Sequence, residues 1–214
     1  LSVHIGSQIT SHVPYKNMLN EVNKIIQNSK YKFKYIDLGG GMGIKYENKT
    51  NKLNYLKYNK LIKSFLKKNN SNIIFEPGRS IIGNTGTLIS KVQYIKKGRN
   101  KSFIILDAGM NDFMRPALYD AFHNIIPVIK TSKKIKGPVE FVGPICETTC
   151  KFGRYKNYQK LNENNYVAIS NVGAYGFVLS SNYNTRPLVA EIFVNKNKSK
   201  TIRKRQNLLE LIKV

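Results

Sequence analysis

The feature that most restricts the fold of this chain is an alternation of apolar and amphipathic segments over its first 85 residues. Apolar runs that end in glycine, proline or serine occupy residues 1–6, 33–41 and 71–80. Apolar residues at helical spacing follow the first two runs, at 15–30 and 54–69. A strand that passes through a tight turn into a helix, repeated along the chain, is typical of parallel βα architecture. We therefore expect a parallel sheet whose carboxyl edge carries the chemistry, as in a βα barrel.

The pattern changes near residue 85. Short apolar stretches separated by turn residues occupy 85–97, 102–109, 137–143, 165–171 and 188–195. One helical segment interrupts them at 115–123, where Pro116 suits the first turn. The sequence thus predicts an antiparallel β domain over 86–214 after the α/β part over 1–85. The tail 198–214 is expected to be a charged, solvated stretch followed by a short amphipathic helix.

The formal charge of +24 raises the question of nucleic-acid binding. The excess is mostly lysine, beside 25 Asn, 24 Ile and 6 Ala, a joint bias that A/T-rich codons produce without any ligand. A nucleic-acid surface would need arginine interleaved with aromatic residues, and only seven arginines are present. We therefore expect no nucleic-acid partner. No run of 18 apolar residues predicts a membrane span, and two cysteines without a signal-peptide pattern indicate a cytoplasmic protein.

Several turns carry side chains with possible chemistry. DLGGGMG places four glycines after a strand and suits an anion such as phosphate, although a tight turn without a ligand is the alternative. Its spacing is neither a nucleotide P-loop nor a Rossmann fingerprint. HIGSQ offers a ring and a hydroxyl, or else a core histidine. FEPGRS offers Glu76 and Arg79, which could pair with each other or bind one ligand.

Further candidates lie in the second half. Arg115 and Tyr119 are four residues apart on one helical turn and suit a substrate carboxylate, or else are a surface arginine beside a core tyrosine. Tyr175 in GAYGF is framed by small residues, so its hydroxyl could enter a site. The only cysteines, Cys146 and Cys150, have C-x3-C spacing. That spacing neither completes a tetrahedral metal site nor matches a C-x-x-C redox pair.

Each motif is weak alone, but together and in this order they closely resemble the diaminopimelate decarboxylases, a family of fold-type III pyridoxal-phosphate enzymes. The segments that carry the resemblance are HIGSQI, DLGGGMGI, EPGRSI, DAGMNDFMRPALYDAFH, GPICE and GAYGFVLSSNYNTRP. The resemblance runs from Leu1 nearly to Val214 and corresponds to roughly the second half of a family member. It implies the C-terminal part of an alanine-racemase-like (β/α)8 barrel over 1–85, followed by an antiparallel β-barrel or sandwich domain over 86–214.

The resemblance also implies an activity and a set of site residues. The activity is the decarboxylation of meso-2,6-diaminoheptanedioate (meso-diaminopimelate) to L-lysine and CO2 by a homodimer with its active sites at the interface, without a metal. The residues implied to hold pyridoxal 5′-phosphate are His4, Ser7, Gly39, Gly40, Gly41, Glu76, Pro77, Gly78, Arg79 and Tyr175. Those implied to hold the substrate are Arg79, Arg115, Tyr119, Glu147 and Tyr175. Of the residues implied to be catalytic, His4 stacks on the cofactor ring, and Cys146 donates a proton from the partner subunit.

Two departures from the family pattern matter. The lysine that anchors the cofactor lies upstream of HIGSQ in this family, and the sequence begins at Leu1 on an apparent strand, so we expect a fragment that is inactive and poorly folded alone. The family commonly has Cys-Glu-Ser-Gly-Asp where this chain has Cys146 to Cys150, so we assign Cys150 no catalytic role. The alternatives are another decarboxylase, acting on ornithine, arginine or carboxynorspermidine, and a non-catalytic regulatory relative. Arg115 and Tyr119 favour a substrate with a second carboxylate, which ornithine lacks.

Overall fold

The computed structural model describes residues 1–47 and 51–212 of the 214-residue chain. The chain divides into two compact units, Leu1–Gly86 and Thr87–Val214, each with its own buried core. Residues 213 and 214 of the predicted tail helix lie outside the described residues. Within the described ranges, no helix is both long and apolar enough to cross a membrane.

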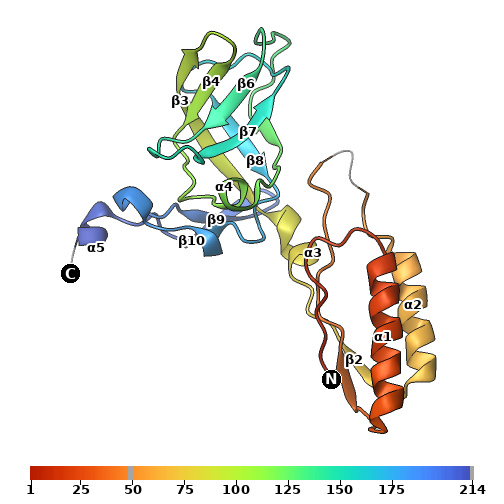
Figure 1. Ribbon diagram of the computed structural model, residues 1–214. Helices are drawn as coiled ribbons and strands as arrows, with labels where there is room; N and C mark the ends of the chain where they lie inside the picture. Colours follow the sequence, from red (N-terminus) through yellow and green to blue (C-terminus); the bar gives the residue numbers. More distant parts are fainter. Residues whose placement is uncertain (48–50, 213–214) are drawn as a thin grey trace. The chain divides into compact units, whose positions relative to one another are not determined.

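The first unit is built on two amphipathic helices, α1 (Val13–Ser29) and α2 (Tyr55–Lys68), which lie side by side (Figure 1). The face that α1 buries consists of Tyr15, Met18, Leu19 and Val22, which is the spacing of one helical stripe. The face that α2 buries consists of Tyr58, Ile62 and Phe65. Asn54 caps α2 by accepting a hydrogen bond from the Lys57 N–H at 3.0 Å. Both helices form where the apolar periodicity predicts them.

The strands of the first unit are parallel, as the sequence predicts, but short. β1 (Tyr35–Asp37) pairs with β2 (Asn72–Ile74), and Ile36 faces Ile73 in the register. The predicted strand at 1–6 is reduced to one isolated parallel bridge between Ser2 and Asp37. After β2 the chain forms α3 (Arg79–Ile82) and a 3-10 turn (Gly83–Thr85).

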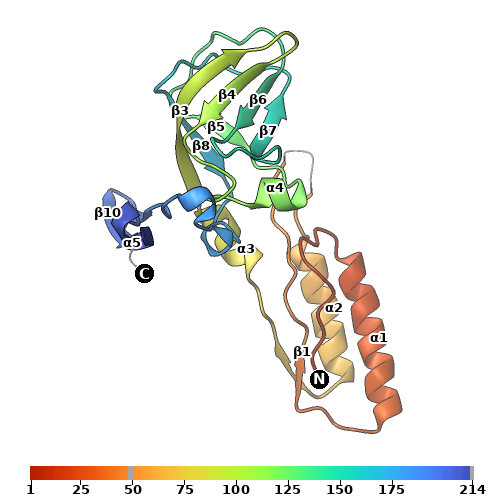
Figure 2. The ribbon, with the colours of Figure 1, turned by 60° about the vertical axis from the view of Figure 1, so that its left-hand side comes forward.

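The second unit is built on a six-stranded sheet in the order β5-β8-β3-β4-β6-β7, which Figure 2 shows as a curled sheet. Its strands are β3 (Thr87–Lys97), β4 (Ser102–Leu106), β5 (Ile125–Pro127), β6 (Val139–Val142), β7 (Lys151–Tyr155) and β8 (Tyr166–Ser170). The prediction of a wholly antiparallel domain is wrong at one pair, because β4 and β6 are parallel. The two strands are separated in sequence by α4 (Arg115–Tyr119) and β5, and this long connection lets β6 return in the same direction as β4.

Two tyrosines, one at the end of the edge strand β7 and one three residues beyond it, bond to the other edge strand, β5. The hydroxyl of Tyr155 accepts a hydrogen bond from the Ile125 N–H at 2.8 Å, and the hydroxyl of Tyr158 donates to the Ile125 carbonyl at 2.9 Å. The rings of Tyr155 and Tyr158 pack on Phe141 in the core. Burial raises the pKa of both tyrosines, so the phenols stay neutral donors and acceptors. The two hydroxyls thus satisfy the backbone N–H and carbonyl of Ile125 at the outer edge of β5.

The tail is exposed as predicted, but part of it forms a strand that the sequence does not predict. Residues expected to be a solvated stretch include the strand β10 (Lys198–Arg203), which pairs antiparallel with β9 (Glu191–Asn195). Every residue of β10 is exposed, so the strand has no apolar alternation that a sequence pattern could detect. The short helix α5 (Leu208–Ile212) follows where a helix is predicted.

Candidate active site

The glycine turn after β1 is the point where three turns of the first unit meet. Gly39 and Gly41 have φ values of +65° and +83°, in the left-handed region that favours glycine. A Cβ on Gly40 would lie 2.1 Å from the carbonyl oxygen of Glu76, so no side chain fits there. Backbone packing therefore accounts for these glycines, and their role in binding an anion stays a prediction.

The HIGSQ segment lies against this turn. Nδ1 of His4 accepts a long hydrogen bond, 3.5 Å, from the Gly40 N–H, and a Cβ on Gly39 would lie 2.8 Å from the same nitrogen. The His4 side chain is exposed. His4 is therefore not part of the core of this unit, and its role in binding a ligand stays a prediction.

The guanidinium of Arg79 joins two side chains of the same unit. It donates to the Ser7 hydroxyl at 3.1 Å and to the Tyr46 hydroxyl at 2.6 Å, and it lies 5.6 Å from the centroid of the Tyr46 ring. The Glu76 side chain, by contrast, is exposed. The sequence does not single out Tyr46, because nothing in its spacing distinguishes it from the other aromatic residues.

The first unit thus brings one group of predicted residues together beyond the carboxyl ends of β1 and β2. The group consists of His4, Ser7, Gly39, Gly40, Gly41, Glu76, Pro77, Gly78 and Arg79. It contains a cation, a hydroxyl, an exposed carboxylate and an exposed imidazole. The cation and the hydroxyl can donate to an anionic group, and the carboxylate can accept from a protonated nitrogen of the same ligand.

The second unit holds the other predicted residues. Arg115 and Tyr119 lie on α4 as predicted, but their environments differ, because Arg115 is 6% exposed and Tyr119 is 62% exposed. Nη1 of Arg115 lies 2.8 Å from Nε2 of His123, which is wholly buried. His123 is a second residue whose role the sequence pattern does not predict.

Tyr175 lies on a turn with unusual backbone geometry. Its φ is +60°, which is uncommon for a residue with a side chain, and its side chain is 44% exposed. The next residue, Gly176, has no room for a Cβ, which would lie 2.2 Å from the Val172 carbonyl. Residues held in such conformations are concentrated at functional sites, which is consistent with the predicted role.

The two cysteines are free thiols in different environments. Cys146 is exposed, whereas Cys150 is buried and its Sγ accepts a hydrogen bond from the Met110 N–H at 3.4 Å. A Cβ on Gly143 would lie 2.5 Å from this sulfur, so Gly143 has no room for a side chain beside Cys150. Glu147 is exposed and accepts a hydrogen bond from the Thr148 N–H at 3.0 Å. Only the first thiol is accessible for chemistry.

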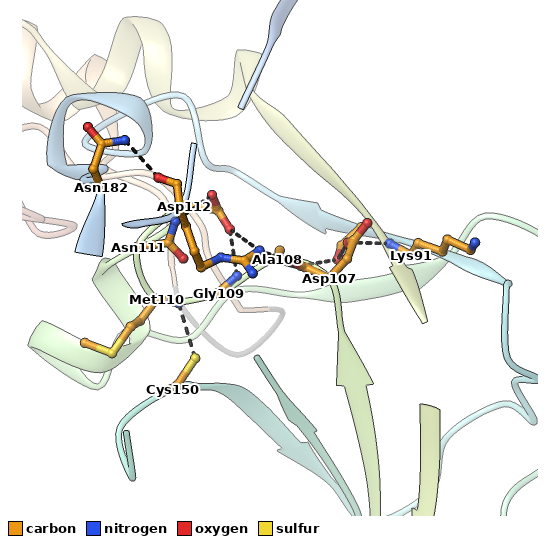
Figure 3. A network of polar contacts seen from close by, with 11 residues as sticks. Lys91, Asp107, Ala108, Gly109, Met110, Asn111, Asp112, Cys150 and Asn182 are labelled. Carbon is orange, nitrogen blue, oxygen red and sulfur yellow. Dashed lines mark hydrogen bonds and ion pairs between the residues drawn. The ribbon is translucent and has the colours of Figure 1, made fainter. Parts of the chain in front are cut away.

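A polar network holds the loop between β4 and α4, and Cys150 belongs to it (Figure 3). Asp107 accepts from the Ser90 hydroxyl at 2.5 Å and from the Lys91 N–H at 2.8 Å. Asp112 accepts from the Gly109 N–H at 2.7 Å, and Arg186 lies 3.9 Å from its carboxylate. Burial raises the pKa of Asp112, against the opposing effects of these partners. The network fixes the loop that leads into Arg115.

Residues 12–173 match the protein family described as "Pyridoxal-dependent decarboxylase, C-terminal sheet domain", and the chain belongs to this family. It is 43% identical over 207 residues to the diaminopimelate decarboxylase of Aquifex aeolicus, covering 95% of this chain and 49% of that protein. It is 41% identical over 217 residues to the diaminopimelate decarboxylase of Zymomonas mobilis, covering 100% and 51%. The resemblance seen in the sequence motifs is confirmed.

Nearly the whole length of this chain is similar in fold to part of a solved structure. The crystal structure of diaminopimelate decarboxylase from Helicobacter pylori complexed with L-lysine matches with a TM-score of 0.89 and 38% sequence identity, covering 98% of this chain and 52% of that one. The chain spans about half the length of the curated relatives that it matches.

Proposed function

We propose that the protein carrying this chain decarboxylates meso-diaminopimelate to L-lysine and CO2 with pyridoxal 5′-phosphate as cofactor. The observation that carries the proposal is the similarity over nearly the whole chain to diaminopimelate decarboxylases, one of them solved with L-lysine. The predicted residues of the first unit support it, because their side chains gather at one edge.

The residues of the first unit fit the cofactor. A phosphate dianion needs several donors, and Ser7 lies 3.1 Å from the Arg79 guanidinium beside the glycine turn, where the Gly40 N–H makes a long hydrogen bond, 3.5 Å, to Nδ1 of His4. The exposed carboxylate of Glu76 suits a protonated pyridine nitrogen, and the exposed ring of His4 suits stacking on a flat ligand. When bound, the cofactor supplies an electron sink for the negative charge left at Cα when CO2 departs.

The side chains of the second unit would act on the substrate. Arg115 holds its charge where little water competes, which strengthens a charge-assisted hydrogen bond to a carboxylate, and the exposed hydroxyl of Tyr119 adds a second donor. Glu147 suits the substrate ammonium group. Tyr175 would contact both substrate and cofactor. The exposed thiol of Cys146 would donate a proton to Cα after CO2 leaves.

We propose the remaining features on the same grounds. The first unit would be part of a (β/α)8 barrel, the second would carry the substrate residues, and the protein would be a cytoplasmic homodimer in which each Cys146 serves the partner's site. The parallel β1–β2 pair, the glycine turn and the curled sheet support this architecture. Because the chain spans about half of its relatives, we expect the 214 residues alone to have no turnover.

The test is to assay the complete gene product with pyridoxal 5′-phosphate and meso-diaminopimelate. Release of CO2 and L-lysine in equal amounts is expected. Turnover of ornithine, arginine or carboxynorspermidine in place of meso-diaminopimelate would overturn the proposed substrate. Cofactor binding without turnover of any of these substrates would favour the non-catalytic relative.

A further inference from the structure

The side chain of His123 is enclosed in the second unit, and each of its ring nitrogens makes a directed polar contact. Its Nδ1 lies 2.9 Å from the Ser170 carbonyl oxygen, and its Nε2 lies 2.8 Å from Nη1 of Arg115. The ring packs edge-on against Phe113, with the ring centroids 4.6 Å apart. The exposed fraction of His123 is 0%. A polar ring buried this completely is held by its hydrogen bonds as well as by packing.

These two contacts determine the tautomer of the ring. A carbonyl oxygen only accepts hydrogen bonds, so Nδ1 must carry the proton. A guanidinium only donates, so Nε2 must present its lone pair to Arg115. A doubly protonated ring would place an N–H and a second positive charge against the guanidinium. His123 is therefore a neutral acceptor for Arg115 in the folded protein.

The chain path explains how the two residues meet. Both come from one short segment, in which α4 begins at Arg115 and ends at Tyr119. Asp120 then adopts the left-handed conformation, with φ of 48°, which ends the helix. His123 follows three residues later, two residues before β5 begins, with its ring against the guanidinium.

We propose that His123 is a positioning residue that orients the guanidinium of Arg115 for the substrate carboxylate. The inference rests on the proposed function, because it assigns His123 a part in the binding that Arg115 performs. By accepting from Nη1, the ring fixes the plane of the guanidinium, and the other donors of this group are then directed at a fixed angle. A guanidinium held in one plane loses less freedom when it binds a planar carboxylate.

Two amide substitutions separate this role from a structural one. In His123→Asn the amide nitrogen replaces Nδ1 and keeps the bond to Ser170, but the acceptor for Arg115 is lost. In His123→Gln the longer side chain places its amide oxygen near the former Nε2, and the acceptor is kept. If His123 orients Arg115, the Gln variant should therefore keep substrate binding better than the Asn variant. If the role of His123 is purely structural, the Asn variant should bind substrate as well as the Gln variant or better.

The experiment measures KM and kcat for meso-diaminopimelate in the complete gene product and both variants. We expect Asn to raise KM by about tenfold or more with a smaller change in kcat, and Gln to stay within about threefold of the wild type. Tyr158→Phe is the matched control, because it removes a buried hydrogen bond in the same unit without touching Arg115. It should lower the melting temperature and leave KM unchanged.

A second readout does not depend on turnover. Selective 15N labelling of histidine in the wild-type gene product should show His123 as the neutral tautomer protonated at Nδ1. Equal KM values for Asn and Gln, or a ring protonated at Nε2, would overturn the positioning role while the proposed function stands. A wild type that has the expected tautomer but no turnover would overturn the proposed function. In that case, crystal structures of the two variants test the positioning role, and an Arg115 guanidinium equally ordered in both would overturn it.

Discussion

At the residue scale, replacing each cysteine by alanine tests the difference between the two thiols. Cys146→Ala removes an exposed thiol and should lower kcat by at least about tenfold, because the proposed proton donor is lost. Cys150→Ala removes a buried sulfur that accepts from Met110, so it should lower the free energy of unfolding by about 1–2 kcal/mol with much less effect on kcat. Turnover of the complete gene product and denaturant midpoints measure the two effects. Equal losses of kcat would contradict the assignment.

A pair of tyrosines in the first core gives a second test. Their rings are 4.6 Å apart, but only the Tyr15 hydroxyl is satisfied, by donating to the Gly40 carbonyl at 3.1 Å. Among residues 1–47 and 51–212, the buried hydroxyl of Tyr58 has no hydrogen-bond partner. Tyr15→Phe should therefore lower the free energy of unfolding by about 1 kcal/mol, and Tyr58→Phe should leave it unchanged or raise it. Similar losses in both variants would show that the Tyr58 hydroxyl is satisfied in solution.

Tyr58 of the same pair also predicts how the free energy of unfolding changes at alkaline pH. Burial raises the pKa of Tyr58 from 10.0 to about 12. Between these values the unfolded chain releases the phenolic proton while the folded chain keeps it, so the free energy of unfolding falls as pH rises. Tyr58→Phe removes this contribution and should lose less stability than the wild type between about pH 10 and about pH 12. Parallel pH curves of the denaturant midpoint for the two proteins would contradict the assignment.

At the element scale, the glycine turn after β1 is the least tolerant segment. A Cβ on Gly40 meets the Glu76 carbonyl at 2.1 Å, so Gly40→Ala must push two turns apart and should cost about 3 kcal/mol or more. Gly78 is the control for stability, because a Cβ there meets nothing within 4 Å and its φ is −102°. Gly78→Ala should change the free energy of unfolding by less than about 1 kcal/mol. Denaturant midpoints of both variants decide, and equal costs would refute the steric argument.

The helices and strands also show which parts of the fold can be predicted from sequence patterns. The helices α1, α2 and α4 are predictable because buried residues recur at helical spacing or a proline marks the start. The strand β10 is not predictable, because all its side chains are exposed. The parallel register of β4 and β6 is absent from any local pattern, since it depends on where a long connection returns.

For the site, the turns were predictable but the contacts were not. Glycine clusters and isolated charged residues mark Gly39 to Gly41 and Arg79 in the sequence. The partnership of Arg79 with Tyr46 and that of Arg115 with His123 depend on the folded path of the chain. No spacing rule connects an arginine to a histidine eight residues later across the end of a helix.

At the scale of the whole molecule, the two separate cores predict two unfolding transitions. Phe65 belongs to the core of the first unit, and Phe141 belongs to the core of the second unit. Among the residues that the structure describes, the first unit has one pair of short strands with open edges, so it is the unit that we expect to fold poorly in the 214-residue chain alone, and it should melt at the lower temperature. In calorimetry of the 214-residue chain, Phe65→Leu should lower the first transition and Phe141→Leu the second, each by several degrees. One transition that both variants shift equally would contradict this independence.

The environments of the two thiols also give the chain a practical property. One sulfur is open to reagents and the other is enclosed by Met110 and Gly143. A maleimide dye added to the folded chain should therefore attach at Cys146 alone, without removing any residue first. The dye would sit on the loop that carries the proposed proton donor, so its fluorescence would report events at that loop directly.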